Sequence, residues 1–400
     1  MASLQLADSA MTSRHRLDPD SEVFIDGLRG LLAIAVLVGH AFDLGIRQSF
    51  GHDVLAMPPF WRTLHSTLGA GVFYVWGFFV ISGLCIHQSI SRDLSSGVFR
   101  WSRYLYARVT RLYPLHLVAL LLAVIALPHG SEITGNASVH PWRQLVATVF
   151  MLHGFTEAFP GFEPSWSLAN EAAYYVVWPL ALILGAGSLV RAAGYSLLGL
   201  VGPALCVALL WGAGSAGGSS LLNGVWVIGV LFPTWLAGAA LAMNWQRVSQ
   251  WVTFRRWLLG IVLGGLNAAM VSVLKFTDTA AAFIDPLSII SIPAWVIVLA
   301  GGHHLRLSTR GSLTAKCQRL GLLSYPCYIL HMPLMCLTDW AVVTFLPVWL
   351  WTPPMARIAW LLAPSALLLI GLGPWVEARL LEWRKGAMAR AFVKPIGLAM

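Results

Sequence analysis

The sequence predicts an all-α polytopic membrane protein: a helical bundle of about ten transmembrane helices, with the N- and C-termini in the cytoplasm. Three observations support this prediction. Of the 400 residues, 58% are hydrophobic and only 11% are charged, which is unlike an ordinary water-soluble domain. Apolar runs close to the 20 or so residues needed to cross a bilayer recur along the whole chain. Lysine and arginine gather in alternate connecting segments, as they do in multi-pass membrane proteins.

The apolar runs divide the chain into tails and crossings. Residues 1–22 are polar and lack the apolar core of a signal peptide, so we expect a cytoplasmic tail there. A single membrane domain at 23–378 and a basic cytoplasmic tail at 379–400 follow. The run at 144–155 has twelve residues, too few to cross, and we expect it to be re-entrant or interfacial. The predicted crossings are 24–42, 68–90, 112–128, 166–190, 193–212, 222–243, 257–275, 284–302, 320–345 and 355–377.

The positions of the cations agree with this count. With the N-terminus inside, 21 of the 26 lysines and arginines fall at the cytoplasmic side. Counting 144–155 as a crossing would invert everything after it and place three basic clusters outside. The net charge of +9 is therefore interpreted as a bias between the two membrane faces and not as a sign of a nucleic-acid partner.

The first crossing, FIDGLRGLLAIAVLVGHAF at 24–42, carries Arg29 and His40 eleven residues apart. On a helix this spacing is three turns plus about 20°, with a rise of roughly 16 Å, so both side chains share one face. Ionisable groups inside a membrane are costly and mark a candidate functional site. The alternative is that Arg29 extends to the cytoplasmic surface and His40 hydrogen-bonds a neighbouring helix.

An arginine cluster precedes the third predicted crossing, in the stretch RYLYARVTRLYPLHL. Arg108 and Arg111 are at i and i+3 and share a face, and Arg103 lies one turn earlier. Guanidinium groups bind phosphate in a bidentate manner, so a cytosolic donor that carries phosphates is a candidate ligand. Lipid headgroups are the alternative ligand.

Two later helices carry further polar residues. In PSWSLANEAAYYVVWP, Ser167 and Glu171 are at i and i+4, near the outer end of their crossing. The carboxylate could orient an imidazole or accept a proton, or Ser167 could simply cap the helix. In LLSYPCYILHMPL, Ser324, Tyr328 and His331 share a face near mid-membrane. An intramembrane histidine is as often a packing residue as a catalytic one.

Small residues and cysteines are interpreted more simply. Ser82-Gly83, in FFVISGLCI, would let another helix approach closely. The five cysteines form no CxxC pair and are interpreted as packing residues, without a metal site.

Together, the blocks FIDGLRG, FFVISG, RVTRLYPL, SWSLANE and SYPCYILHMP resemble the acyltransferase-3 family of integral membrane acyltransferases. They span residues 24 to about 335. The resemblance implies transfer of an acyl group, usually acetyl, from cytosolic acyl-CoA to a hydroxyl of a saccharide or glycosylated product, often at the outer face. Acetyl-CoA would be the donor substrate, without a metal, in a bacterial plasma (inner) membrane. Polysaccharide biosynthesis or export machinery is the partner that such an activity suggests.

Roles for the candidate residues follow from this resemblance. Arg103, Arg108 and Arg111, with Arg29, would hold the phosphates of coenzyme A. His40 would act as general base or transient acyl carrier, with His331 as the second choice.

Ser167 and Glu171 would face the acceptor, and Glu171 would position it or the imidazole. Two rival interpretations remain. One is a transporter or flippase that uses His40, Glu171 and His331 as a proton relay, although the sequence has no internal repeat. The other is a non-catalytic scaffold of an export complex.

Overall fold

The structure is a computed structural model that describes residues 17–51, 53–69, 71–95, 99–134, 140–156, 158–185, 188–211, 220–277 and 284–392. Within these ranges all regular secondary structure is helical, which confirms the all-α prediction. The helices are α2 (Pro19–Phe50), α3 (Pro59–Leu68), α4 (Gly71–Ser95), α5 (Trp101–Ile125), α6 (Leu127–Thr134), α7 (Pro141–Val149), α8 (Trp166–Leu184), α9 (Leu189–Ser196), α10 (Gly202–Trp211), α11 (Ser220–Met243), α12 (Trp245–Trp251), α13 (Phe254–Thr277), α15 (Leu287–Ala300), α16 (Ser312–Phe345) and α17 (Pro354–Phe392).

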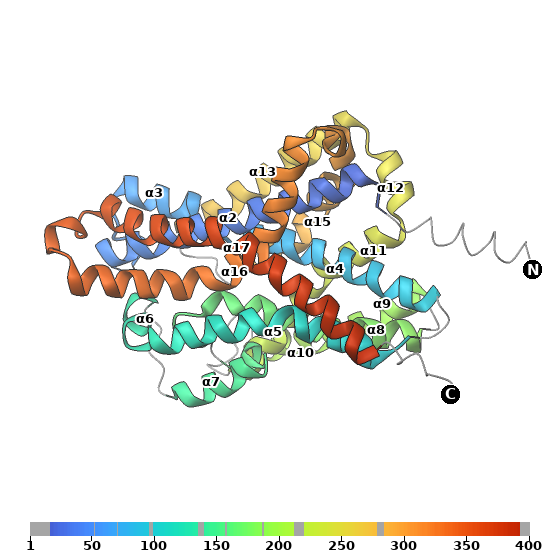
Figure 1. The fold of residues 1–400 in the computed structure, drawn as a ribbon, viewed down its shortest axis with the longest axis horizontal. Helices are drawn as coiled ribbons and strands as arrows, with labels where there is room; N and C mark the ends of the chain where they lie inside the picture. Colours follow the sequence, from blue (N-terminus) through green and yellow to red (C-terminus); the bar gives the residue numbers. More distant parts are fainter. Residues whose placement is uncertain are drawn as a thin grey trace, which may run out of the picture.

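The number of membrane crossings agrees with the prediction. Nine helical segments in the described ranges are long and apolar enough to cross a bilayer, or ten if Leu287–Ala300 and Gly302–Thr309, bent by 41°, count as one crossing. The segment at 144–155 forms the short helix α7 and a 3-10 turn at His153–Phe155, and is not among the crossings. Helix α2 begins and α17 ends at the same end of the bundle (Figure 1). Which membrane face this end occupies stays a prediction.

Several predicted boundaries differ from the structure. Helix α5 begins at Trp101 and not near 112, so the arginine cluster lies on the crossing helix itself. Helix α17 continues to Phe392, into the predicted C-terminal tail. A π-helical turn at Leu197–Val201 separates α9 from α10. The connection between the predicted crossings 24–42 and 68–90 contains most of α3, because Pro59 at the first helical position has a backbone angle that suits a helix start.

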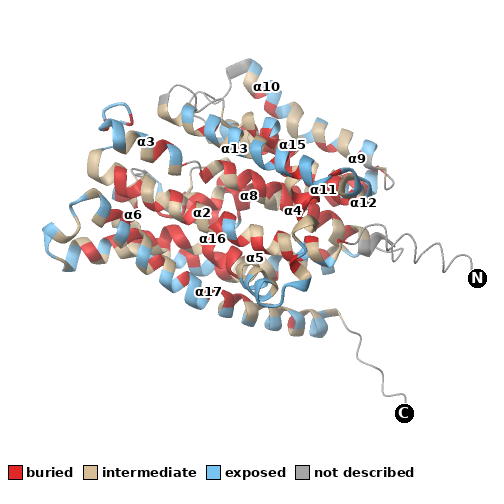
Figure 2. Ribbon diagram, turned by 90° about the horizontal axis from the view of Figure 1, so that it is seen from above, coloured by how far each residue is buried: buried red, intermediate tan, exposed pale blue. Residues whose placement is uncertain are grey.

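Helix α2 lies inside the bundle, where it packs against α16, α17 and α4. Figure 2 shows buried residues along α2, α4, α8 and α16. Glycines allow the closest approaches. A Cβ on Gly30 would collide with the Leu320 carbonyl, and one on Gly321 would lie 2.8 Å from Cβ of Asp26. Helices α2 and α16 therefore meet almost backbone to backbone.

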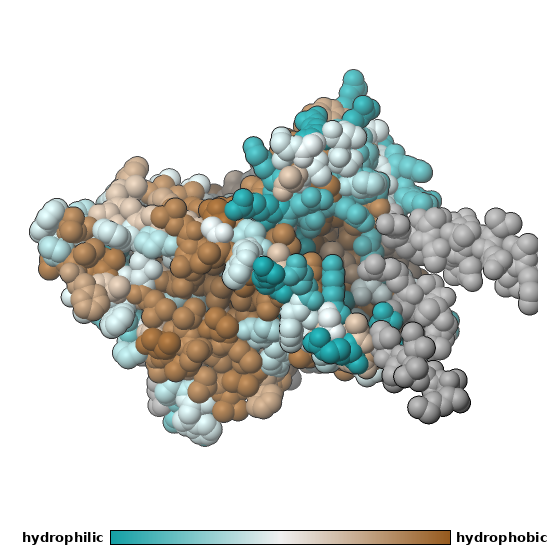
Figure 3. All heavy atoms as spheres, in the orientation of Figure 1, coloured by the Kyte–Doolittle hydropathy of each residue, from teal (hydrophilic) through white to brown (hydrophobic). Residues whose placement is uncertain are grey.

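A second glycine contact joins α4 to α11. A Cβ on Gly83 would collide with the Trp235 carbonyl, and one on Gly238 with the Val80 carbonyl. The predicted packing role of Ser82-Gly83 is thus confirmed for Gly83. On the outside, Figure 3 shows a broad band of hydrophobic residues, with hydrophilic residues gathered toward the end where α2 begins and α17 ends. This distribution suits a bundle that lies in a bilayer.

Candidate active site

Described residues line two neighbouring cavities inside the bundle. The arginine cavity holds about 700 Å³, its open mouth included, and is lined by Arg29, Val75, Phe78, Phe79, Ile81, Ser82, Cys85, Ile86, Arg111, Leu112, Ser167, Leu168, Glu171, Tyr175, Ser324, Tyr325 and Tyr328. The histidine cavity holds about 660 Å³ on the same measure and is lined by Gly39, His40, Asp43, Arg47, Gly69, Gly71, Val72, Val75, Pro164, Trp166, Lys275 and Tyr328. Because Val75 and Tyr328 line both cavities, they form the wall between them.

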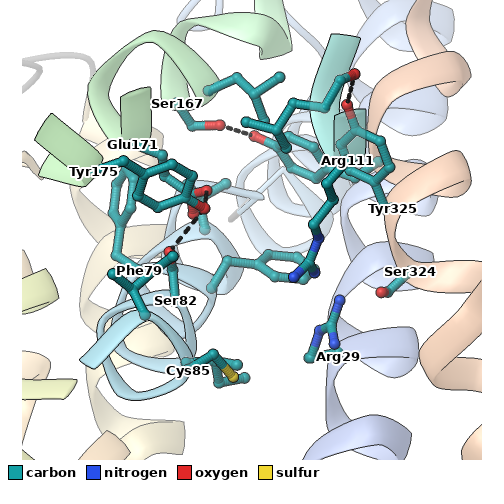
Figure 4. A pocket seen from close by; sticks show the side chains of 17 residues that line it. Arg29, Phe79, Ser82, Cys85, Arg111, Ser167, Glu171, Tyr175, Ser324 and Tyr325 are labelled. Atoms are coloured by element: carbon teal, nitrogen blue, oxygen red, sulfur yellow. Dashed lines mark hydrogen bonds between the residues drawn. The ribbon is translucent and has the colours of Figure 1, made fainter. Parts of the chain in front are cut away.

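Two guanidinium groups face one another in the arginine cavity. Figure 4 shows Arg29, from α2, and Arg111, from α5, with their nitrogen ends directed toward the same space. Arg29 lies 3.8 Å from Asp26, a loose ion pair with a partly exposed carboxylate. Among the described residues, Arg111 has no carboxylate within ion-pair distance and donates no hydrogen bond. Two adjacent cations with so little compensation would attract an anion.

The opposite wall of the arginine cavity carries a chain of hydrogen bonds from α8 to α11. The Tyr175 hydroxyl donates to Oε2 of Glu171 at 2.6 Å and lies 3.3 Å from Oγ of Ser82. Ser82 Oγ in turn accepts from Nε1 of Trp235 at 3.2 Å. These contacts fix the Glu171 side chain across the cavity from the two arginines (Figure 4).

A pair of histidines lies next to the histidine cavity. His331 Nδ1 contacts the carbonyl oxygens of Tyr328 at 2.8 Å and Cys327 at 3.1 Å. Since a carbonyl only accepts, Nδ1 of His331 carries its proton and Nε2 is an acceptor. His331 Nε2 lies 3.1 Å from Nδ1 of His40, which also lies 3.0 Å from the Val36 carbonyl. His40 is therefore protonated at Nδ1.

This arrangement leaves Nε2 of His40 with a free electron pair. No described residue hydrogen-bonds that nitrogen, and His40 lines the histidine cavity. A neutral imidazole whose second nitrogen is fixed by a partner can accept a proton from a bound hydroxyl or attack a carbonyl carbon. His331 is buried and does not line either cavity, so any effect of its ring on a ligand there would pass through His40.

Charged residues surround the far part of the histidine cavity. Oδ1 of Asp43 accepts from Arg47 Nε at 3.1 Å and lies 2.7 Å from Nε2 of the buried His65. The Lys275 ammonium donates to the Gly69 carbonyl. Carboxylate, guanidinium and ammonium groups here, together with the ring of Trp166, provide hydrogen bonds and a flat apolar surface for a polar ligand.

The structure separates some residues that the sequence grouped together. Of the three clustered arginines, Arg111 lines the arginine cavity, whereas Arg108 donates to Ser89 Oγ at 2.8 Å beside it, and Arg103 is exposed on the surface of α5. Ser167 and Glu171 were expected to face the acceptor at the outer side. Both line the arginine cavity, where α8 begins directly after the buried residues Pro164 and Ser165. Which substrate they face stays a prediction.

Sequence reasoning missed several residues of the site. Tyr175 could have been found from its i+4 spacing to Glu171. Asp43 was recognised on the helix face of Arg29 and His40, three residues after His40, but was given no role in the chemistry. His65 and Trp166 carry no such signal, and Lys275 was only a weak one. The predicted absence of a metal is not decided by the structure, although the described residues contain no group of three or more potential metal ligands.

Comparisons with known proteins address the family. A family model described as an acyltransferase domain, Acyl_transf_3, matches residues 22–376. Acyltransferase MdmB of Streptomyces mycarofaciens is 27% identical over 78% of this chain and 79% of its own length. Protein 2 in the picA locus of Rhizobium radiobacter is 28% identical over 40% of this chain and 83% of its own length. No solved structure matches. With a family model that covers nearly the whole chain and a multi-pass helical fold, this protein belongs to the acyltransferase-3 family of membrane acyltransferases.

Proposed function

We propose that this protein is an O-acyltransferase that moves an acetyl group from cytosolic acetyl-CoA to a hydroxyl of a saccharide or glycosylated product at or near the outer face of a bacterial plasma (inner) membrane. One observation supports this best: the cavity of Arg111, a guanidinium with no ion-pair partner among the described residues, and the cavity of the His40 imidazole share a single wall. A donor rich in phosphate and an acceptor with a hydroxyl can then meet at that wall.

The donor suits the arginine cavity. Arg111 and Arg29 would bind phosphate oxygens of coenzyme A, with Arg108 beside them nearer the start of α5. From Arg29 to His40 the rise along α2 is roughly 16 Å, a distance that the extended pantetheine arm of coenzyme A can cover. The thioester would therefore reach the wall of Val75 and Tyr328 while the phosphates stay at the arginines.

The acceptor suits the histidine cavity. Asp43, Arg47 and Lys275 offer hydrogen bonds to sugar hydroxyls, and Trp166 offers an apolar face for a sugar ring. Polysaccharide biosynthesis or export machinery would supply such an acceptor. The lipid bilayer around the bundle would keep the donor and the acceptor on separate sides.

The proposed reaction uses His40 as general base. Nε2 of His40 takes the proton of the acceptor hydroxyl as its oxygen forms a bond to the acyl carbon, the carbon–sulfur bond breaks, and the thiolate of coenzyme A takes up a proton. His331 accepts from Nδ1 of His40 and so stabilises the imidazolium. Glu171, fixed by Tyr175, would orient the donor in the arginine cavity.

The test is mass spectrometry of surface glycans, glycolipids and secreted metabolites from a deletion strain, complemented with the wild type, His40→Ala or the control His303→Asn. His303 is a half-buried histidine that lines neither cavity, lies beside the ring of His304 and, among the described residues, hydrogen-bonds the backbone carbonyl of Ala300. We expect a loss of about 42 mass units per acetyl on deletion, restored by the wild type and the control but not by His40→Ala. An unmodified glycan that accumulates on the wrong side, without any change in mass, would favour a transporter instead.

A further inference from the structure

The wall between the two cavities depends largely on one side chain. Val75 and Tyr328 are the residues common to both linings, and both are buried. The first residues of α8 and the turn before them complete the wall. Pro164, in the turn, and Trp166, the first residue of α8, line the histidine cavity, whereas Ser167, the next residue, lines the arginine cavity. Val75 is short and branched, so Tyr328 is the wall residue whose side chain can swing as a unit.

The hydroxyl of Tyr328 fastens the ring to the turn before α8. It lies 2.7 Å from Oγ of Ser167 and donates to the Pro164 carbonyl at 3.1 Å. The ring packs edge-on against Phe78, with ring centroids 5.4 Å apart, and lies 6.1 Å from the ring of His331. Hydrogen bonds of its hydroxyl therefore hold the Tyr328 side chain in the wall, where its ring packs against Phe78 on one side and lies near His331 on the other.

We propose that Tyr328 is a partition that shields the donor thioester from water in the histidine cavity and opens to the acceptor. This inference rests on the proposed function. Water and the acceptor hydroxyl would reach the acyl carbon by the same path. If water attacks, its oxygen bonds the acyl carbon, the carbon–sulfur bond breaks, one water proton goes to the sulfur, and the acid is released. The partition decides whether the acyl group is transferred or lost.

The sequence position of Tyr328 suits this role. It lies three residues before His331 on α16, and His331 Nδ1 donates to its carbonyl. The Tyr328 ring can therefore swing without moving the backbone carbonyl that positions His331. Tyr325, one turn earlier, lines only the arginine cavity and donates to the Leu112 carbonyl. It provides a matched tyrosine that faces the donor but does not belong to the wall.

The first experiment measures the ratio of acetyl-CoA hydrolysis to acetyl transfer in proteoliposomes, for the wild type, Tyr328→Ala, Tyr328→Phe and Tyr325→Ala. We expect Tyr328→Ala to raise the ratio about tenfold or more, because water then reaches the thioester freely. Tyr328→Phe keeps the ring but loses both tip contacts, so its ratio should lie between those of the wild type and Tyr328→Ala. An unchanged ratio in Tyr328→Ala, or an equal rise in Tyr325→Ala, overturns the proposal.

A second experiment does not need catalysis. Cys85 lines the arginine cavity, so its reaction with a small, charged, membrane-impermeant thiol reagent reports access. In a background without Cys206 and Cys317, the two other cysteines that are not buried, we expect the reagent to label Cys85 from the arginine-cavity side in every variant. From the histidine-cavity side it should label Cys85 fastest in Tyr328→Ala, more slowly in Tyr328→Phe, which lacks both tip contacts, and not in the wild type. Equal labelling of the wild type from both sides overturns the partition.

The two experiments separate this inference from the function on which it rests. Side-dependent labelling of Cys85 without any acetyl transfer would retain the partition and refute the acyltransferase assignment. Acetyl transfer that depends on His40, with no effect of Tyr328→Ala in either experiment, would retain the assignment and refute the partition. Size-exclusion profiles and thermal unfolding in detergent identify a variant that has failed to fold, in which case Tyr328→Phe carries both measurements.

Discussion

Replacing His331 by phenylalanine should slow acyl transfer without weakening the binding of either substrate. Phenylalanine keeps a planar ring, somewhat larger than imidazole, in a fully buried site, but His40 Nδ1 loses the acceptor that lies 3.1 Å away. This hydrogen bond gains strength when His40 becomes an imidazolium in the transition state. A hydrogen bond to a charged group contributes about 1.5–3 kcal/mol, and each 1.36 kcal/mol is tenfold in rate. We therefore expect kcat to fall about 10- to 150-fold.

The assay compares single and double variants of purified protein in proteoliposomes. His40→Ala should cost about 10²- to 10⁴-fold, and the double variant His40→Ala/His331→Phe should cost no more than His40→Ala, because His331 acts only through His40. His303→Asn is the matched histidine control. Full activity of His331→Phe, or losses that multiply in the double variant, would refute the link between the two rings. Thermal unfolding checks that each variant remains folded.

Three further outcomes are expected. Arg111→Gln should raise the KM for acetyl-CoA about tenfold or more, measured by initial rates, whereas Arg103→Gln, on the exposed face of α5, should change it little. Lys275→Gln should raise the KM for the acceptor and leave that for acetyl-CoA unchanged, since Lys275 lines only the histidine cavity. Burial lowers the pKa of His153, which lies outside the crossing helices, from 6.5 to about 4. The folded state therefore favours the neutral ring. The resulting contribution to the free energy of unfolding, up to about 3 kcal/mol, is complete above pH 6.5 and is lost as the pH falls toward 4. Thermal unfolding of His153→Gln should accordingly depend less on pH between 7 and 5 than that of the wild type.

Contacts within one helix were largely predictable from the sequence. The spacing of Arg29 and His40 fixed their common face, and both line the interior along α2. Composition and alternating charge predicted the number of crossings, because a bilayer constrains the length and polarity of each span. The predicted ends of the helices were less accurate. An amphipathic or basic segment can continue a crossing helix beyond its apolar part, as in α5 and α17.

Contacts between distant segments were not predictable in the same way. His40 and His331 are 291 positions apart, and no pattern along the chain indicates which of several intramembrane histidines will meet His40. Ser167 was predicted near one end of its crossing and is the second residue of α8, but the sequence did not indicate that the hydroxyl of Tyr328, 161 positions away, would contact it. Such placements depend on three-dimensional packing and not on local periodicity.

The backbone contact between α2 and α16 has a consequence for how this protein can change over time. Gly30 and Gly321 lock together the two helices that carry the histidine pair. In contrast, Lys275 and the Gly69 carbonyl that it binds belong to α13 and to the end of α3. Substitutions in α3 and α13, whether natural or engineered, can therefore change the far part of the histidine cavity without moving His40 and His331. We expect substrate range to evolve through α3 and α13, and activity itself to tolerate little variation at the glycines of α2 and α16.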